Sequence, residues 1–241
     1  PGATGPTSII ADLATTWSVS SDGLQYTFIL RQGVKYDDGT EFNATHVKYT
    51  FDRAIGMADP NGAFVGLGFG DIIQDITVVD THTVRFDLKS PFPFLIALLA
   101  GEECVMVDPK YAPMQGTSWN ATDAVLYKEG DPRASTPAGL GPYILANWTR
   151  SGGKDQTMKL VANPNYWNAS AGIPKTKNMI IQFYASSSNL ALAIEGAEVD
   201  VAFRQLGVTD INTMKSNTTL QVWLGTGSFI QYLCLQEKLG L

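Results

Sequence analysis

Cysteine and histidine are scarce in this sequence, which limits its possible metal and disulfide chemistry. Its 241 residues include two cysteines, Cys104 and Cys234, and two histidines, His46 and His82. Two cysteines are too few for a disulfide framework, and apolar neighbours on both favour free, buried thiols over a disulfide. The four residues also lack the spacing of a metal site. We therefore expect no metal and no cofactor, and we expect both histidines at the surface.

Positive charge and long apolar runs are also lacking. Seventeen Lys and Arg face 23 Asp and Glu, which gives a formal net charge of −6. Nucleic acids and anionic membranes attract basic surfaces, so this balance argues against both as partners. A membrane-spanning helix needs about 20 apolar residues, and the apolar run at residues 92–100 is far too short. We expect a soluble folded protein.

The stretch of residues 17–53 changes from strand periodicity to helix periodicity. Tyr26, Phe28 and Leu30 recur at every second position and predict a half-buried strand. Asp and Gly residues on both sides of it are typical of tight turns. The following segment predicts a helix whose first turn is capped by Asn43. The apolar stripe of that helix consists of Val47, Phe51, Ala54 and Ile55.

Two hairpins are predicted beyond this stretch. Residues 76–88 form the first, which turns at residues 80–82 and buries alternate apolar side chains of its second strand. Those side chains are Val84, Phe86 and Leu88. The second hairpin pairs residues 143–149 with residues 156–162.

The segments between these elements are read as one helix and two connectors. The glycine-rich residues 66–70 predict a flexible connector, because they lack the Lys and the setting of a phosphate loop. Residues 92–100 are apolar all round and predict a buried short helix. The polar residues 113–136 predict a long loop.

The last third of the chain predicts a βαβ unit. Residues 179–184 form its first strand, Ser186 caps a helix that Gly196 ends, and residues 197–203 form its second strand. A helix over residues 209–216 follows, with strands at residues 220–224 and 229–235. The predicted fold class is therefore mixed α/β.

Several motifs resemble those of one protein family. The stretch WSVSSDGLQYTFILRQGVKYDDGTEF resembles a motif of the family 5 extracellular solute-binding proteins, the peptide- and nickel-binding components of ABC importers. The segments GLGPY, NPNYW and AEVDVA resemble three further family motifs. The chain departs from the family at Glu41, usually Pro, at Thr45-His46, usually Glu-Asp, and at Leu140 and Ala197, usually Thr and Gly.

The resemblance implies a periplasmic-binding-protein type II-like lobe with mixed sheets. We expect a hairpin-rich subdomain at residues 1–140, an α/β subdomain at residues 141–241, and a second lobe beyond this chain. It also implies a monomer outside the cytoplasm. Such a protein captures a peptide, sugar or metal complex between two lobes and docks on an ABC permease in the membrane.

The family members are extracellular or periplasmic, and the resemblance implies a lipoprotein or another membrane-anchored protein of this kind. One lobe supplies only part of such a site, so this chain alone is expected to bind a ligand weakly. The chain starts at Pro1 without a signal peptide, and the resemblance stops at Tyr232-Leu233, which favours a fragment of a longer protein.

Enzyme chemistry finds little support in the residues. Ser151 and Lys154 have the spacing of an S-x-x-K motif but flank two glycines of a hairpin turn, and the motif needs a helix. Glu102 and Glu103 are adjacent carboxylates, whereas a glycosidase needs two that face each other across a bond. A secreted hydrolase using Glu102 or Glu103 stays as an alternative, as does a ligand-sensing domain of a regulator.

One short segment is the candidate ligand site. Phe203, Arg204 and Gln205 follow directly after the predicted strand at residues 197–203. In α/β sheets ligands bind outside the carboxyl ends of the strands, and an Arg there can hold a carboxylate with two hydrogen bonds. The alternative is a solvated loop arginine, and the sequence does not decide between the two.

Five N-x-S/T sequons indicate a glycoprotein of the cell surface. Their acceptors are Asn43, Asn120, Asn147, Asn168 and Asn217.

Overall fold

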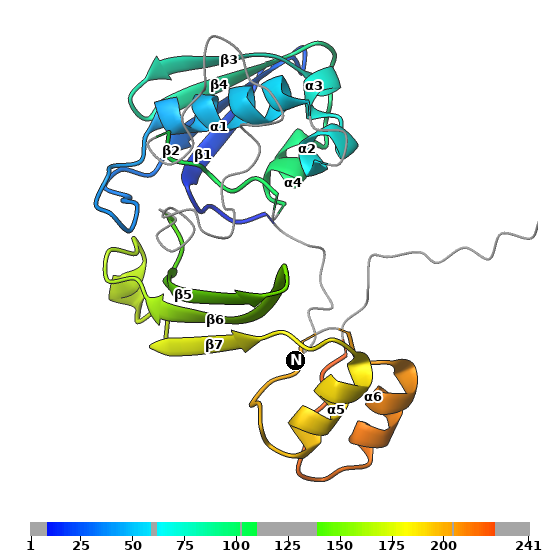
Figure 1. The fold of residues 1–241 in the computed structure, drawn as a ribbon. Coiled ribbons are helices and arrows are strands. Elements are labelled where there is room, and N and C mark those ends of the chain that lie inside the picture. Colours follow the sequence, from blue (N-terminus) through cyan, green and yellow to red (C-terminus); the bar gives the residue numbers. More distant parts are fainter. Residues whose placement is uncertain (1–8, 59–61, 102, 110–138, 204, 225–241) are drawn as a thin grey trace, which may run out of the picture. The chain divides into compact units, whose positions relative to one another are not determined.

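A computed structural model of the chain describes residues 9–58, 62–101, 103–109, 139–203 and 205–224 (Figure 1). The chain divides into two compact units. One comprises Thr7–Phe183, and the other comprises Tyr184–Leu241 together with Pro1–Pro6. Within the described residues, every helix is too short or too polar to cross a bilayer.

The first sheet of the Thr7–Phe183 unit is antiparallel, with the strand order β1-β2-β4-β3. The predicted alternation is confirmed, because Tyr26, Phe28 and Leu30 are buried and face the core. The turn before β2 is held by Asp22, whose carboxylate accepts a hydrogen bond from the Leu24 amide at 3.0 Å. The four strands are β1 (Ala14–Val19), β2 (Gln25–Leu30), β3 (Ile73–Asp80) and β4 (Thr83–Leu88).

Helix α1 (Ala44–Met57) lies across one face of this sheet (Figure 1). The Asn43 side chain accepts a hydrogen bond from the Thr45 amide at 2.9 Å, so the predicted cap is confirmed. Val47 and Phe51 are buried, and the Phe51 ring meets the Phe86 ring of β4 at 5.1 Å between centroids. The apolar stripe of the helix therefore packs on the apolar face of the sheet.

The prediction of two surface histidines is wrong. His46 is buried, and its ring packs against the rings of Tyr36 and Phe42 at centroid distances of 5.3 and 6.0 Å. Its Nδ1 atom completes the cap of α1 by accepting a hydrogen bond from the Asn43 amide. Burial lowers the pKa of His46, although the nearby Asp108 opposes the shift. His82 is half-buried, and its Nε2 atom is buried without a hydrogen-bond partner among the described residues.

Residues 66–70, predicted as a flexible connector, contain the end of the short helix α2 (Ala63–Gly66) and the start of the short helix α3 (Phe69–Ile72). Phe64 and Phe69 explain the difference, because their rings contact the Phe51 ring at 5.3 and 5.6 Å. Aromatic packing therefore fixes a segment whose glycines indicated flexibility.

Helix α4 (Leu95–Leu99) confirms the helix predicted within residues 92–100 but not its burial. Only Leu95 of this helix is buried, and Phe94, just before it, is 68% exposed. The segment is apolar on all sides, but the core covers only part of so short a helix. The predicted loop at residues 113–136 lies outside the described residues.

The second sheet of the unit is antiparallel, with the order β5-β6-β7. Strands β5 (Tyr143–Ser151) and β6 (Lys154–Ala162) confirm the second hairpin, which turns at Gly152 and Gly153, both with positive φ. Strand β7 (Asn178–Gln182) follows a 3-10 turn, η3 (Ala169–Ala171). The first sheet precedes residue 141 and the second follows it, and the proposed subdomain boundary near residue 141 stays a prediction.

The other unit contains α5 (Ser187–Glu195) and α6 (Val208–Lys215). Both helices were predicted, and the Ser186 hydroxyl caps α5 by accepting a hydrogen bond from the Asn189 amide at 3.2 Å. The predicted strands at residues 197–203 and 220–224 are wrong, because neither segment is extended into a sheet. The predicted strand at residues 229–235 lies outside the described residues.

The end of α5 explains why residues 197–203 do not begin a strand. The Glu198 amide donates to the Ala193 carbonyl at 2.9 Å, and the Ala197 amide donates to the Ile194 carbonyl at 3.3 Å. These two bonds form a Schellman motif, which closes a helix and requires a left-handed residue. That residue is Ala197, with φ of 56°. The helix cap therefore uses the residues that the β pattern assigned to a strand.

Replacing Ala197 by glycine should stabilise this unit. Glycine adopts the left-handed conformation without the steric cost that alanine bears, and the gain exceeds the extra entropy of the unfolded chain. We expect the free energy of unfolding to rise by roughly 0.5 kcal/mol. Urea unfolding measures this change. Ala197→Val is the matched control and should destabilise the unit, and equal stability of the two variants would contradict the assigned cap.

Candidate functional site

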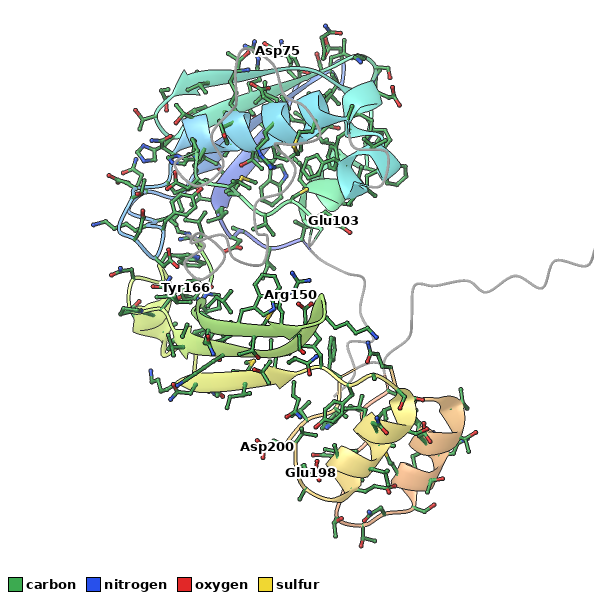
Figure 2. The ribbon with its side chains drawn as sticks, in the orientation of Figure 1. Asp75, Glu103, Arg150, Tyr166, Glu198 and Asp200 are labelled. Carbon is green, nitrogen blue, oxygen red and sulfur yellow. The ribbon has the colours of Figure 1, made fainter. Side chains whose placement is uncertain are left out.

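The predicted site lies on the connection between α5 and α6, residues 196–207. Phe203 is 75% exposed, and Gln205 is also exposed, while Arg204 lies outside the described residues. Figure 2 shows Glu198 and Asp200 on the same connection, where it leaves α5. No strand forms at residues 197–203, so the segment does not follow the carboxyl end of a strand as predicted.

Two other properties of this connection fit ligand binding. Gln205 has φ of 61°, a left-handed conformation that is uncommon for residues other than glycine. Such conformations cost energy and cluster at ligand-binding positions. An exposed aromatic ring two residues away offers a stacking surface. The segment can therefore present an aromatic face, an amide and, from the sequence, a guanidinium to a ligand.

Among the described residues, the structure gives no catalytic carboxylate pair that includes Glu103. Glu103 is exposed after α4 (Figure 2), and Glu102 lies outside the described residues. Among the residues that the structure describes, no three His, Cys, Asp or Glu side chains gather as metal ligands.

Cys104 is a free thiol, half-buried, and its Sγ atom donates to the Leu98 carbonyl at 3.5 Å. Burial raises the pKa of this thiol to about 11, which keeps it protonated and makes it a poor nucleophile. Cys234 lies outside the described residues.

One polar stripe of α1 was not predicted. His46, Thr50 and Arg53 are spaced at i, i+4 and i+7, which places them on one side of the helix. All three are buried. This spacing is present in the sequence, but the prediction for this helix rested on the neighbouring apolar stripe, which contains Val47 and Phe51. Thr50 and Arg53 line a pocket together with Glu103.

The sequon asparagines differ in their environments. The Asn43 and Asn217 side chains accept hydrogen bonds from nearby backbone amides, whereas Asn147 on β5 is exposed. Asn168 is half-buried before η3, and Asn120 lies outside the described residues. Glycosylation stays a prediction.

Comparison with known proteins identifies a family and several relatives of this chain. The family model for bacterial extracellular solute-binding proteins, family 5, middle region, matches residues 8–238. The glutathione-binding protein GsiB of Escherichia coli O1:K1 is 32% identical over 191 residues, which are 79% of this chain and 33% of the relative. Di/tripeptide-binding protein 2 of Pseudomonas aeruginosa is 33% identical over 185 residues, 71% of this chain and 32% of the relative.

A solved structure gives the same result for the fold. The periplasmic binding protein DppA of Helicobacter pylori, solved in complex with the peptide STSA, matches with a TM-score of 0.66 and 27% identity. The match covers 89% of this chain and 41% of DppA. The chain spans about a third of the length of the curated relatives that it matches.

Proposed function

The chain belongs to the bacterial extracellular solute-binding proteins of family 5, and on this basis we propose that it forms part of the substrate-binding component of an ABC importer. The observation that carries the proposal is the family match over residues 8–238, together with relatives named for binding glutathione and short peptides. The protein captures a small solute outside the cytoplasm and delivers it to a membrane permease. No bond of the solute is made or broken; closure around the ligand and release are the mechanism.

The proposed ligand is a short peptide. Glutathione, dipeptides and tripeptides share a peptide backbone and a free carboxylate, so a site for them needs a cation and surfaces for side chains. Arg204 supplies the cation, Phe203 supplies an aromatic surface, and Gln205 supplies an amide. These three residues form one side of the site, and the remainder of a longer protein supplies the other.

The same proposal covers the partners and the location of the protein. It acts as a monomer in the extracellular or periplasmic space, anchored to the membrane, and its macromolecular partner is the permease. The hydrolase alternative receives no support from the named relatives, which are binding proteins. A ligand-sensing domain would keep the same fold but would need a regulatory module in the same polypeptide.

Arg204→Gln should weaken the binding of short peptides. A hydrogen bond to a charged group contributes about 1.5–3 kcal/mol, which corresponds to a loss of affinity of roughly tenfold to a hundredfold. Calorimetric titration of the longest polypeptide that the gene encodes, with a tripeptide and its C-terminal amide, measures the loss. The variant should lose affinity for the free acid and much less for the amide.

Lys215→Gln is the matched control, because it removes one positive charge from α6 in the same unit. It should leave both affinities unchanged. Equal effects of Arg204→Gln on the acid and the amide would remove Arg204 as the carboxylate-binding residue. Failure of the unsubstituted protein to bind any short peptide would contradict the proposed function itself.

A further inference from the structure

The first turn of α1 is closed by a histidine. His46 stands at the third helical position, where a glutamate or glutamine commonly completes a capping box. Its Nδ1 atom accepts a hydrogen bond from the Asn43 amide at 3.3 Å, and the turn contains no acidic residue. An imidazole nitrogen accepts a hydrogen bond only when it carries no proton. This half of the cap therefore requires a neutral ring.

A proton on Nδ1 would remove the acceptor of the Asn43 amide. Nδ1 also lies 3.1 Å from the side-chain oxygen of Asn43, so a protonated ring would donate to that oxygen instead. The oxygen already accepts from the Thr45 amide at 2.9 Å and from the Thr45 hydroxyl at 2.6 Å. Protonation therefore exchanges the bond that closes the turn for a third bond to an oxygen that already has two.

The surroundings of the ring also oppose a positive charge. His46 is 7% exposed and packs against the rings of Tyr36 and Phe42. The N-terminus of a helix carries the positive end of the helix dipole, which disfavours a cation in the first turn. Burial lowers the pKa of His46, and the attraction of the nearby Asp108 carboxylate does not offset it. Burial raises the pKa of Tyr36, with Asp108 and Asp38 adding to the shift, so this neighbour stays uncharged.

The capped turn is bonded to two other segments of the Thr7–Phe183 unit. The Ala44 amide donates to the Thr81 carbonyl, between β3 and β4, at 2.9 Å. The His46 carbonyl accepts from the Thr50 hydroxyl at 2.8 Å, and that hydroxyl accepts from the Val107 amide at 2.9 Å. Loosening the turn therefore weakens the attachment of α1 to the first sheet and to the segment that contains Val107.

We propose that the cap at His46 is a proton-operated switch, which makes the Thr7–Phe183 unit sensitive to acid. With a neutral ring, the first turn of α1 is closed. With a protonated ring, the Asn43 amide is released and the folded state loses stability. This device does not depend on the proposed function and uses none of its residues.

The direction of the pH dependence follows from the lowered pKa. Above about pH 6.5, the usual pKa of histidine in an unfolded chain, the ring is neutral in both states and its contribution to stability is fully present. Below that pH, the unfolded chain takes up a proton that the folded chain does not bind until the folded-state pKa is reached. Within this window, the folding equilibrium constant should fall by up to about tenfold per pH unit through this one group.

NMR of the 241-residue chain from about pH 8 to about pH 5 tests the switch. The His46 ring signals should titrate below about pH 6.5, and the protection of the Asn43 amide against hydrogen exchange should fall with the same midpoint. A His46 pKa at or above the usual value of histidine would overturn the proposal. So would an Asn43 amide whose protection does not change as His46 titrates.

Two variants separate His46 from the other titrating groups. His46→Gln keeps a hydrogen-bond acceptor at the third helical position but takes up no proton, so its stability in urea should lose the pH dependence that His46 contributes. His82→Gln is the matched control, because it removes the other histidine of the chain and should retain that dependence. It also leaves a single histidine signal, so the ring titration decides the matter even if His46→Gln does not fold. Equal pH dependence in His46→Gln and the unsubstituted chain would contradict the assignment.

Discussion

Replacing Phe51 by alanine is expected to lower the free energy of unfolding of the Thr7–Phe183 unit by about 3–5 kcal/mol. The Phe51 side chain is 0% exposed and lies at the centre of the core. Its ring contacts the rings of Phe64, Phe69 and Phe86 edge-on, with centroid distances of 5.3, 5.6 and 5.1 Å. The truncation removes these contacts and leaves a cavity that the sheet and α1 cannot close.

Urea unfolding followed by tryptophan fluorescence measures this loss, since Trp17 and Trp148 lie in the same unit. Phe94→Ala is the matched control: it removes an equally large ring that is 68% exposed. Its cost should stay below about 1 kcal/mol. Similar costs for the two variants would contradict the central place of Phe51 in the core.

The sequence predicted α1 and three strands of the first sheet, β2, β3 and β4, because their periodicity is local, whereas β1 was not predicted. Tyr26, Phe28 and Leu30 alternate on β2, and the helical stripe with its Asn43 cap lies within one short stretch. His46 was misplaced because its burial depends on Tyr36 and Phe42, which pack on it from outside the helix. A helical pattern identifies a face of a helix but not every side chain that covers it.

The candidate sites were less predictable than the elements. The pocket brings Arg53 of α1 together with Glu103, fifty residues later in the sequence, through the hydrogen bond of Thr50 to Val107. No local sequence pattern predicts that these two residues line the same pocket. The segment with Phe203 and Gln205 was found from an expected strand that the structure does not form, so its support now comes from exposure and backbone conformation.

Three of the family motifs contact one another in the Thr7–Phe183 unit. In GLGPY and NPNYW, the Asn163 amide donates to the Pro142 carbonyl at 2.9 Å, which joins the two motifs. Trp167 ends NPNYW, and the guanidinium of Arg31, which lies within the first motif, is 3.9 Å from the centroid of its ring, a cation–π contact between the two motifs. These contacts join residues that are far apart in the sequence. The motifs are therefore more informative about the fold than about the ligand.

Asn163→Ala should therefore destabilise the Thr7–Phe183 unit by roughly 2–4 kcal/mol. The Asn163 side chain is buried; its Nδ2 atom donates to the Gly141 carbonyl at 3.0 Å, and its Oδ1 atom accepts from the Asn165 amide at 2.9 Å. Alanine removes both bonds and leaves the carbonyl and the amide without these partners.

Urea unfolding gives the stability, and hydrogen exchange of the Asn165 amide reports the lost bond directly. Exchange of this amide should accelerate more in Asn163→Ala than the change in global stability alone explains. Asn165→Ala is the control, because it removes an exposed side chain and keeps the amide that donates to Asn163. Its effect should stay within about 0.5 kcal/mol. If Asn163→Ala matched this control, the side chain would not join the two motifs, and the backbone bond from Asn163 to Pro142 would be their remaining link.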